Sequence, residues 1–168
     1  LIIAPAFFFF FLECAKVKKN IRIMEYFEKA NTEKQNFNQI KTISNGVLIQ
    51  QEDYSKDDLL KNYKVVSNKN PTDNELKDLC FAWVVAKYVK SNAIVFSKDN
   101  KTLGIGAGQM SRIDSTSIAS AKAENQNIDL KNAVMASDAF FPFPDNVEKA
   151  AELGISAIIQ PGGSQNDD

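Results

Sequence analysis

The sequence has 168 residues, of which 44% are hydrophobic and 24% charged, and a formal net charge of -1. This length is sufficient for one domain with a core of its own, or for two small lobes. The 20 basic residues are matched by 21 acidic ones, which excludes the basic excess typical of a nucleic-acid scaffold. No histidine occurs in the sequence, so the commonest general base and metal ligand is missing from this stretch.

The first 27 residues are expected to form a strand, a helix and a second strand. Residues 1–4 are continuously apolar and end at Pro5, which cannot donate to a strand ladder. Residues 8–18 have helix-compatible apolar spacing with a basic last turn, and residues 20–27 alternate as a strand does. The opening apolar run of twelve residues is too short to span a membrane and lacks the basic region of a signal peptide.

The cysteines indicate the compartment. Cys14 and Cys80 lie far apart in apolar helical patterns without a pairing framework, which is typical of a reducing environment. We therefore expect a cytoplasmic protein with no membrane partner. The chain begins without methionine on a strand-like run and stops after a glycine-rich stretch, so we expect it to be a piece of a longer polypeptide.

The middle of the chain predicts a hairpin and then a long helix. Asn45-Gly46 lies between two alternating β-branched runs, which is a strong hairpin signal. After Pro71, Thr72 and Glu75 form a T-x-x-E capping box that marks a helix start. The apolar stripe expected to face a sheet consists of Leu76, Leu79, Cys80, Trp83 and Val84.

The rest of the chain alternates strands and helices. The elements we expect are strands at 92–98 and 102–108 joined by a turn at 99–101, a helix at 111–123, a strand at 132–138, a helix at 146–154 closed by Gly154, and a last strand at 155–160. This order predicts an α/β fold, a three-layer α/β/α sandwich with a mixed sheet. Ligands of such sheets bind at strand ends.

The stretch GIGAGQMSR, residues 104–112, resembles a nucleotide loop but fails both standard tests. Gln109 stands where the dinucleotide fingerprint needs glycine, and no G-K-[ST] follows for a P-loop. Two interpretations remain open. The glycines permit a bulge or a tight strand-to-helix turn, or their bare backbone lets a planar substrate approach beside Ser111 and Arg112, which suit anionic or carbonyl oxygens.

The stretch SDAFFPFPDN, residues 137–146, also has two interpretations. It is a buried connection whose aromatic side chains belong to the core, or it is a rigid aromatic wall for a planar ring, with Asp145 or Asn146 capping the next helix. A zinc deaminase of similar architecture is excluded because the sequence has no histidine and no C-x-x-C pair. A serine or cysteine hydrolase is excluded because no histidine is present to activate the nucleophile.

Three long stretches carry a resemblance to a known family, at residues 70–94, 91–115 and 136–164. They resemble the transformylase part of the bifunctional purine-biosynthesis enzymes that are both AICAR transformylase and IMP cyclohydrolase. The resemblance implies a cytidine-deaminase-like fold and a homodimer whose active site lies at the interface. It further implies that residues 1–168 are part of the transformylase domain, with about 1–70 ending one lobe and forming a connecting hairpin region, about 71–168 forming a second lobe, and the cyclohydrolase domain absent.

The activity implied is formyl transfer from the cosubstrate 10-formyltetrahydrofolate to the 5-amino group of AICAR. Residues carried over from the family are Asn92 at the reacting centre, Lys19 at the nucleotide phosphate, Arg112 and Phe140 at AICAR, Ile113, Pro142, Phe143, Asn146 and Ser164 on the folate side, and Asp138 in a structural potassium site. The Lys-His pair that removes the proton in this family lies in an earlier segment, so we expect these 168 residues alone to be inactive. The alternative is a non-catalytic nucleotide-binding or dimerisation module of the same fold.

Overall fold

The computed structural model describes residues 2–4, 23–25, 38–51 and 63–165. The chain divides into two compact units, Leu1–Tyr54 and Ser55–Asp168, which we describe separately. The helix expected at 8–18 lies outside the described residues. The boundary between two lobes that the resemblance implies, at about residue 70, stays a prediction. The boundary between the two compact units lies earlier, after Tyr54.

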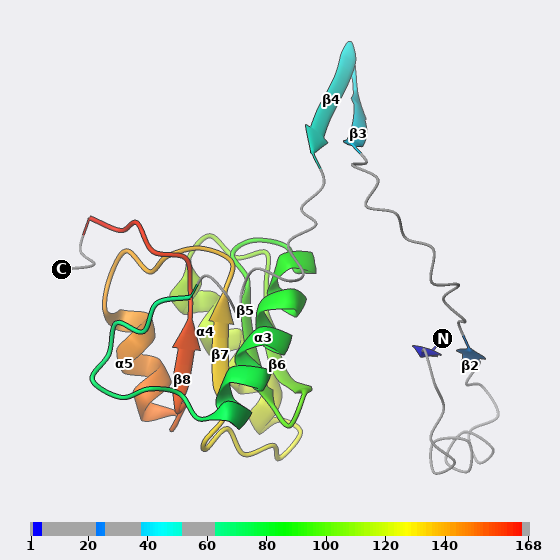
Figure 1. Cartoon of the computed structure of the whole chain (residues 1–168). Helices are drawn as coiled ribbons and strands as arrows, with labels where there is room; N and C mark the ends of the chain where they lie inside the picture. The colour runs from blue at the N-terminus through cyan, green and yellow to red at the C-terminus, as the bar shows by residue number, and fades with distance from the viewer. Residues whose placement is uncertain (1, 5–22, 26–37, 52–62, 166–168) are drawn as a thin grey trace. The chain divides into compact units, whose positions relative to one another are not determined.

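The first unit contains two strand pairs (Figure 1). Strand β1 (Ile2–Ala4) pairs in parallel with β2 (Ile23–Glu25). Both strands lie within the ranges expected from the sequence. A parallel pair requires a long crossover between its strands, and the residues between β1 and β2 lie outside the described part of the chain.

The second pair in this unit is the predicted hairpin, with its turn one residue earlier than expected. Strands β3 (Asn38–Ile43) and β4 (Gly46–Gln51) are antiparallel and closed by the pair Ile43 and Gly46. The turn is therefore Ser44-Asn45, and the expected turn at Asn45-Gly46 is wrong. The expectation assumed a left-handed Gly46, but Gly46 has no positive φ and serves as the first residue of its strand.

The second unit is built on a four-stranded mixed sheet in the order β6-β5-β7-β8. The strands are β5 (Ile94–Lys98), β6 (Lys101–Gly106), β7 (Val134–Ser137) and β8 (Ala157–Ile159). Strand β5 is antiparallel to both β6 and β7, and β7 is parallel to β8. The mixed sheet expected from the sequence is confirmed.

Helices cover both faces of this sheet, which makes three layers (Figure 1). The helices are α3 (Asp73–Tyr88), α4 (Arg112–Glu124) and α5 (Asp145–Glu152). Because side chains alternate along a strand, Val95 joins a core with α3, while Ile94 and Phe96 join a second core with α4 and α5. The three-layer α/β arrangement predicted from the sequence is confirmed.

Helix α3 begins at the predicted capping box. The Thr72 hydroxyl accepts from the Glu75 N–H at 3.3 Å, and the Thr72 N–H donates to the Glu75 carboxylate at 2.8 Å. A hydrogen bond from the Ser156 hydroxyl, followed by those from Thr72, lowers the pKa of Glu75. The capping box thus holds an ionised carboxylate at the positive end of the helix dipole.

The face that α3 buries differs from the one predicted. Leu79, Ala82 and Ala86 are buried against the sheet, whereas Val84 is 41% exposed and Trp83 is only half-buried. The prediction followed the largest apolar side chains, but the helix lies on the sheet through alanines, which allow close approach. Partial burial raises the pKa of the Cys80 thiol, so this side chain stays protonated near neutral pH.

The turn between β5 and β6 depends on a residue that the sequence analysis missed. Asp99 and Asn100 have φ angles of 53° and 54°, the left-handed pair typical of a type I′ hairpin turn. Their N–H groups donate to the carboxylate of Asp78 on α3, at 3.0 and 2.7 Å. Asp78 is only 8% exposed, so this carboxylate ties the helix to the turn.

Replacing Asp78 with alanine should lower the free energy of unfolding by about 2 kcal/mol, because two N–H groups lose their acceptor. Urea denaturation followed by far-ultraviolet circular dichroism measures this loss. Asp73→Ala is the matched control, since Asp73 is an exposed carboxylate in the first turn of the same helix. Equal losses in the two variants would contradict the assigned role of Asp78.

Candidate functional site

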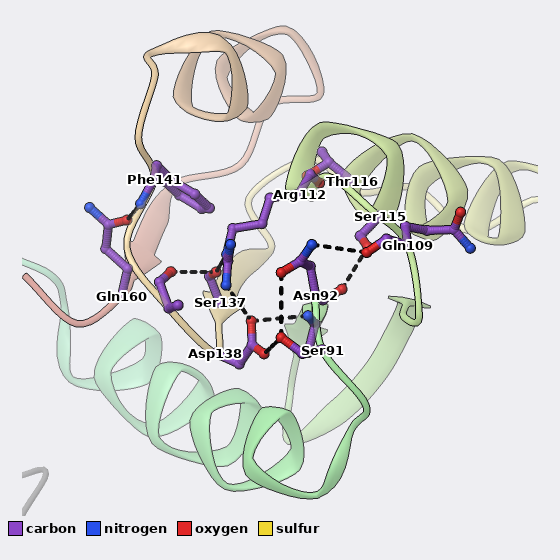
Figure 2. A network of polar contacts seen from close by, with 12 residues as sticks. Ser91, Asn92, Gln109, Arg112, Ser115, Thr116, Ser137, Asp138, Phe141 and Gln160 are labelled. Atoms are coloured by element: carbon purple, nitrogen blue, oxygen red, sulfur yellow. Dashed lines mark hydrogen bonds and ion pairs between the residues drawn. The ribbon is translucent and has the colours of Figure 1, made fainter. Parts of the chain in front are cut away.

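The candidate site lies at one end of the four-stranded sheet, where three strands have their termini. Ile94, which begins β5, pairs with Gly106 at the end of β6 and with Ser137 at the end of β7. The segments flanking these residues therefore meet at a single edge. Figure 2 shows Ser91, Asn92, Arg112 and Asp138 converging there, as expected for a ligand site in an α/β sheet.

Asp138 is the centre of the polar network at this edge. Its Oδ1 accepts from the Ala93 N–H at 3.0 Å and from Nη2 of Arg112 at 3.2 Å. Its Oδ2 accepts from the Ser91 hydroxyl at 2.6 Å. One carboxylate therefore connects the segment before β5, the first turn of α4 and the end of β7.

Arg112 enters this network from the first position of α4. Its Nε donates to the hydroxyl of Ser137 at 3.3 Å, and its ion pair with Asp138 leaves the two side chains 16% and 19% exposed. The helix is capped by Ser111, whose hydroxyl accepts from the N–H of Asp114. The guanidinium is thus fixed on one side and partly open to solvent.

Asn92 is held at both its backbone and its side chain. Its carbonyl accepts from the Ser115 hydroxyl at 2.6 Å, and its Nδ2 donates to the carbonyl of Gln109 at 2.9 Å. The peptide bond between Ser91 and Asn92 is cis. The amide oxygen of Asn92 has a weaker contact, 3.4 Å from the Ser91 hydroxyl, so it keeps acceptor capacity for a ligand.

The glycines of GIGAG serve packing, which decides between the two interpretations left open by the sequence. A Cβ at Gly104 would run into the carbonyl oxygen of Ala119, and one at Gly106 into that of Ser115. Both glycines therefore face α4, so the interpretation that bare backbone admits a substrate is wrong for Gly104 and Gly106. Gly108, with φ of 69°, makes the left-handed turn between β6 and the helix.

The aromatic segment after β7 is divided between core and surface. Phe141 is 6% exposed and belongs to the core beneath α4 and α5, and its N–H donates to Oε1 of Gln160 at 2.6 Å. Phe140 and Phe143 are 38% and 63% exposed. The core interpretation is therefore confirmed for Phe141, and the aromatic-wall interpretation stays a prediction for Phe140 and Phe143. Exposed aromatic side chains in the segment that follows Asp138 suit the face of a planar ring.

Helix α5 starts differently from the prediction. Its N-cap is Pro144 with no side-chain cap bond, so the expected cap at Asp145 or Asn146 is wrong. Proline with φ of -72° is already in the helical region, so the helix begins there without a capping side chain. Asn146 is 2% exposed, accepts from the Thr116 hydroxyl at 2.7 Å and donates to Asp145 at 2.9 Å. A folate contact by this amide would use its second N–H or the second lone pair of its oxygen.

The other expected site residues are placed as follows. Ile113 is half-buried in the first turn of α4, Pro142 is half-buried beside Phe141, and Ser164 is half-buried beyond β8. Lys19 lies outside the described residues. The Ser91 hydroxyl and the Asp138 carboxylate offer adjacent oxygens of the kind a potassium ion takes, but the guanidinium of Arg112 already neutralises this carboxylate. Potassium at this position stays a proposal.

Two features of the described residues concern metals and membranes. Among the described residues, His, Cys, Asp and Glu side chains form no group of three or more that could hold a metal ion. In the same part of the chain, no helix is both long and apolar enough to cross a bilayer.

Several residues of the network were not found from the sequence. Ser91, Ser115 and Ser137 each supply a hydroxyl that fixes Asp138, Asn92 or Arg112. Serine is common at strand ends and helix starts, so no spacing distinguishes these three from others. Of the other members, Arg112 was found from its place at a predicted helix start, whereas Asn92 was assigned only by the family resemblance.

The fold and the site define a class of protein: an α/β sandwich with an asparagine, an arginine and exposed aromatic side chains at the ends of its central strands. A family model described as the AICARFT/IMPCHase bienzyme matches residues 1–122. The chain belongs to this family.

Curated relatives agree with this membership. The bifunctional purine biosynthesis protein PurH of two Neisseria gonorrhoeae strains is 51% identical over 166 residues, which are 99% of this chain and 31% of each relative. The protein of the same name from Neisseria meningitidis serogroup C is 51% identical over 169 residues, with the same coverage. The chain thus spans about a third of the length of these relatives, which are named for purine biosynthesis.

Proposed function

We propose that this chain supplies part of the AICAR and folate pocket of a phosphoribosylaminoimidazolecarboxamide formyltransferase in purine biosynthesis. The observation that carries the proposal is the meeting of Asn92 and Arg112 in one hydrogen-bonded network at the sheet edge, with Phe140 exposed nearby. Family membership supports the same assignment. Cyclohydrolase activity belongs, in this proposal, to a part of the parent polypeptide outside this chain.

The reaction makes one bond and breaks one. The 5-amino nitrogen of AICAR attacks the formyl carbon of 10-formyltetrahydrofolate, the bond from that carbon to N10 breaks, and the amine loses a proton while N10 gains one. This amine is conjugated with its ring and carboxamide, so it is a weak nucleophile that must be oriented. The Asn92 amide and the Arg112 guanidinium can supply that orientation by hydrogen bonds.

The exposed aromatic side chains have a matching role in this proposal. Phe140 would lie against the base of AICAR, and Phe143, Pro142 and Ile113 would lie against the folate. Each offers an apolar face to a planar ring. Ser164 and Asn146 would provide hydrogen bonds on the folate side, Asn146 through the N–H or lone pair that its present bonds leave.

The proton acceptor must come from outside this sequence. Neutral histidine is the usual general base near pH 7, and the sequence contains no histidine. We propose that the acceptor is a Lys-His pair of an earlier segment, that a homodimer completes the site, and that these 168 residues alone bind AICAR without transferring formyl.

Titration calorimetry of AICAR against the chain and its Asn92→Ala variant tests the pocket. We expect the variant to bind AICAR about tenfold more weakly, because it loses one or two hydrogen bonds to the ligand. The matched control is Asn74→Ala, which changes an exposed asparagine in the first turn of α3 and should bind as the wild type does.

The same titrations separate the rival functions. Equal affinity of the wild type and the Asn92 variant, or no binding by either, would contradict the proposed pocket. AICAR binding that depends on Asn92, combined with an absence of formyl transfer in the complete parent polypeptide, would favour the nucleotide-binding module.

A further inference from the structure

Asp138 connects the residues of the candidate site through its carboxylate. Its carboxylate accepts from Arg112, from the Ala93 N–H and from the Ser91 hydroxyl. We propose that Asp138 is a positioning residue that fixes the guanidinium of Arg112 relative to Asn92 and so sets the geometry of AICAR recognition. The AICAR part of this inference rests on the proposed function.

The Arg112 side of the argument concerns a long, flexible side chain. The guanidinium is held at two nitrogens, by Asp138 at Nη2 and by the Ser137 hydroxyl at Nε. Ser137 is fully buried and donates its own proton to the carbonyl of Ala139 at 2.7 Å, so its oxygen presents a lone pair to Arg112. Among the bonds of the described residues, Nη1 of Arg112 takes part in none, and its two N–H groups remain for a ligand.

The Asn92 side of the argument concerns the backbone. Asp138 binds the residues immediately before and after Asn92, through the Ser91 hydroxyl and the Ala93 N–H. The Asp138 N–H also donates to the carbonyl of Ala93 at 3.3 Å. The same carboxylate that fixes the guanidinium therefore fixes the stretch of chain that carries Asn92.

The negative charge of Asp138 is paired with Arg112, and this ion pair favours a role for Asp138 in positioning the guanidinium. The side chains of Arg112 and Asp138 are about equally buried, at 16% and 19% exposure. Because the two opposite charges lie together, each compensates the other. Charge-assisted hydrogen bonds of this kind are stronger and more directional than neutral ones. Replacing the carboxylate with the amide of Asp138→Asn keeps the shape but removes the charge that holds Arg112.

The first test needs no ligand, so it stands apart from the proposed function. Nitrogen-15 NMR of the chain reports the Nε–H of its two arginines, Arg22 and Arg112, and an Arg112→Lys spectrum assigns them. In Asp138→Asn, we expect the Arg112 Nε–H to exchange with water at least about tenfold faster, with the backbone amide spectrum retained. An unchanged exchange rate would overturn the positioning role.

The second test is a double-mutant cycle on AICAR affinity. Asp138→Asn should weaken binding about tenfold, and adding it to Arg112→Met should weaken binding by no more than about threefold further. The amide can still accept from the Ala93 N–H and donate to the Ser91 hydroxyl, so this variant acts mainly through the lost ion pair with Arg112. Independent, multiplicative losses would overturn the inference while leaving the proposed function intact. Absence of AICAR binding by the wild type would contradict the proposed function, and the NMR result would still decide on Asp138.

Two further variants serve as controls for the NMR and binding tests. Ser91→Ala removes one donor to Asp138 but keeps the ion pair, so the Arg112 Nε–H should exchange at the wild-type rate. A faster rate in Ser91→Ala would show that general loosening of the edge, rather than the ion pair, controls Arg112. Asp129→Asn makes the same chemical change at an exposed carboxylate and should leave both exchange and affinity unchanged.

Discussion

Gly106→Ala should lower the free energy of unfolding by at least about 3 kcal/mol, the upper end of what overpacking costs. Gly106 is the last residue of β6 and faces α4, where a Cβ would run into the carbonyl oxygen of Ser115 and crowd its Cα at 2.8 Å. These are backbone atoms of a helix, so no side-chain rotation relieves the overlap. The helix would have to move away from the sheet, and with it the first turn that carries Arg112.

Guanidinium chloride denaturation of the variant, followed by circular dichroism and tryptophan fluorescence, measures this loss. Gly108→Ala is the matched control, two residues further along the same segment. Gly108 has a φ of 69° with no atom within 4 Å of a built Cβ, so alanine there incurs only the left-handed backbone penalty of roughly 1 kcal/mol. Similar destabilisation in the two variants would mean that α4 does not rest on Gly106.

The parts of the fold that the sequence predicted are those fixed by local rules. The capping box at Thr72 and Glu75 requires only residues three apart in one turn of helix, and it forms as expected. Strand β7 and the first four residues of β5 are buried and mostly apolar. Their positions follow from composition because a buried strand between two helix layers tolerates little else.

Predictions that depended on packing partners were less successful. The predicted buried stripe of α3 included Leu79, which is buried as expected, together with Trp83 and Val84. In place of the last two, Ala82 and Ala86 make the contact. Periodicity reports where large apolar side chains recur, but it cannot report how closely a helix approaches its sheet. The same limitation left the glycines of β6 with two interpretations, because the residue that excludes a Cβ at Gly106 is Ser115, on the next element.

The sequence indicated where in the fold the polar network lies, but it did not indicate which of its residues hydrogen-bond to one another. Asp138 lies 26 residues from Arg112 and 47 residues from Ser91. Their meeting depends on β5 lying between β6 and β7, which no local pattern specifies. Residues at the ends of predicted strands were therefore good candidates for the site, while their hydrogen-bond partners required the strand order.

Arg112→Met should weaken AICAR binding by roughly a hundredfold, equivalent to about 2.7 kcal/mol, which is within the range for charge-assisted hydrogen bonds to a ligand. Methionine keeps much of the apolar stem and removes the guanidinium. The Nη1 edge of that group would be the part that contacts AICAR in the proposed pocket. The Asp138 carboxylate would keep its bonds from Ala93 and Ser91, which limits the loss of stability.

The control for this change lies on the same helix. Lys122→Met removes an exposed cation near the other end of α4, where its Nζ donates to the carbonyl of Ile105 at 2.8 Å. Titration calorimetry should give Lys122→Met the affinity of the wild type, and denaturation curves should confirm that both variants are folded at the titration temperature. Equal affinities of Arg112→Met and Lys122→Met would remove Arg112 from the pocket, because a loss of net charge alone affects the two variants equally. A hundredfold difference between them would instead require a specific contact at the sheet edge, where the guanidinium is fixed by Asp138 and Ser137.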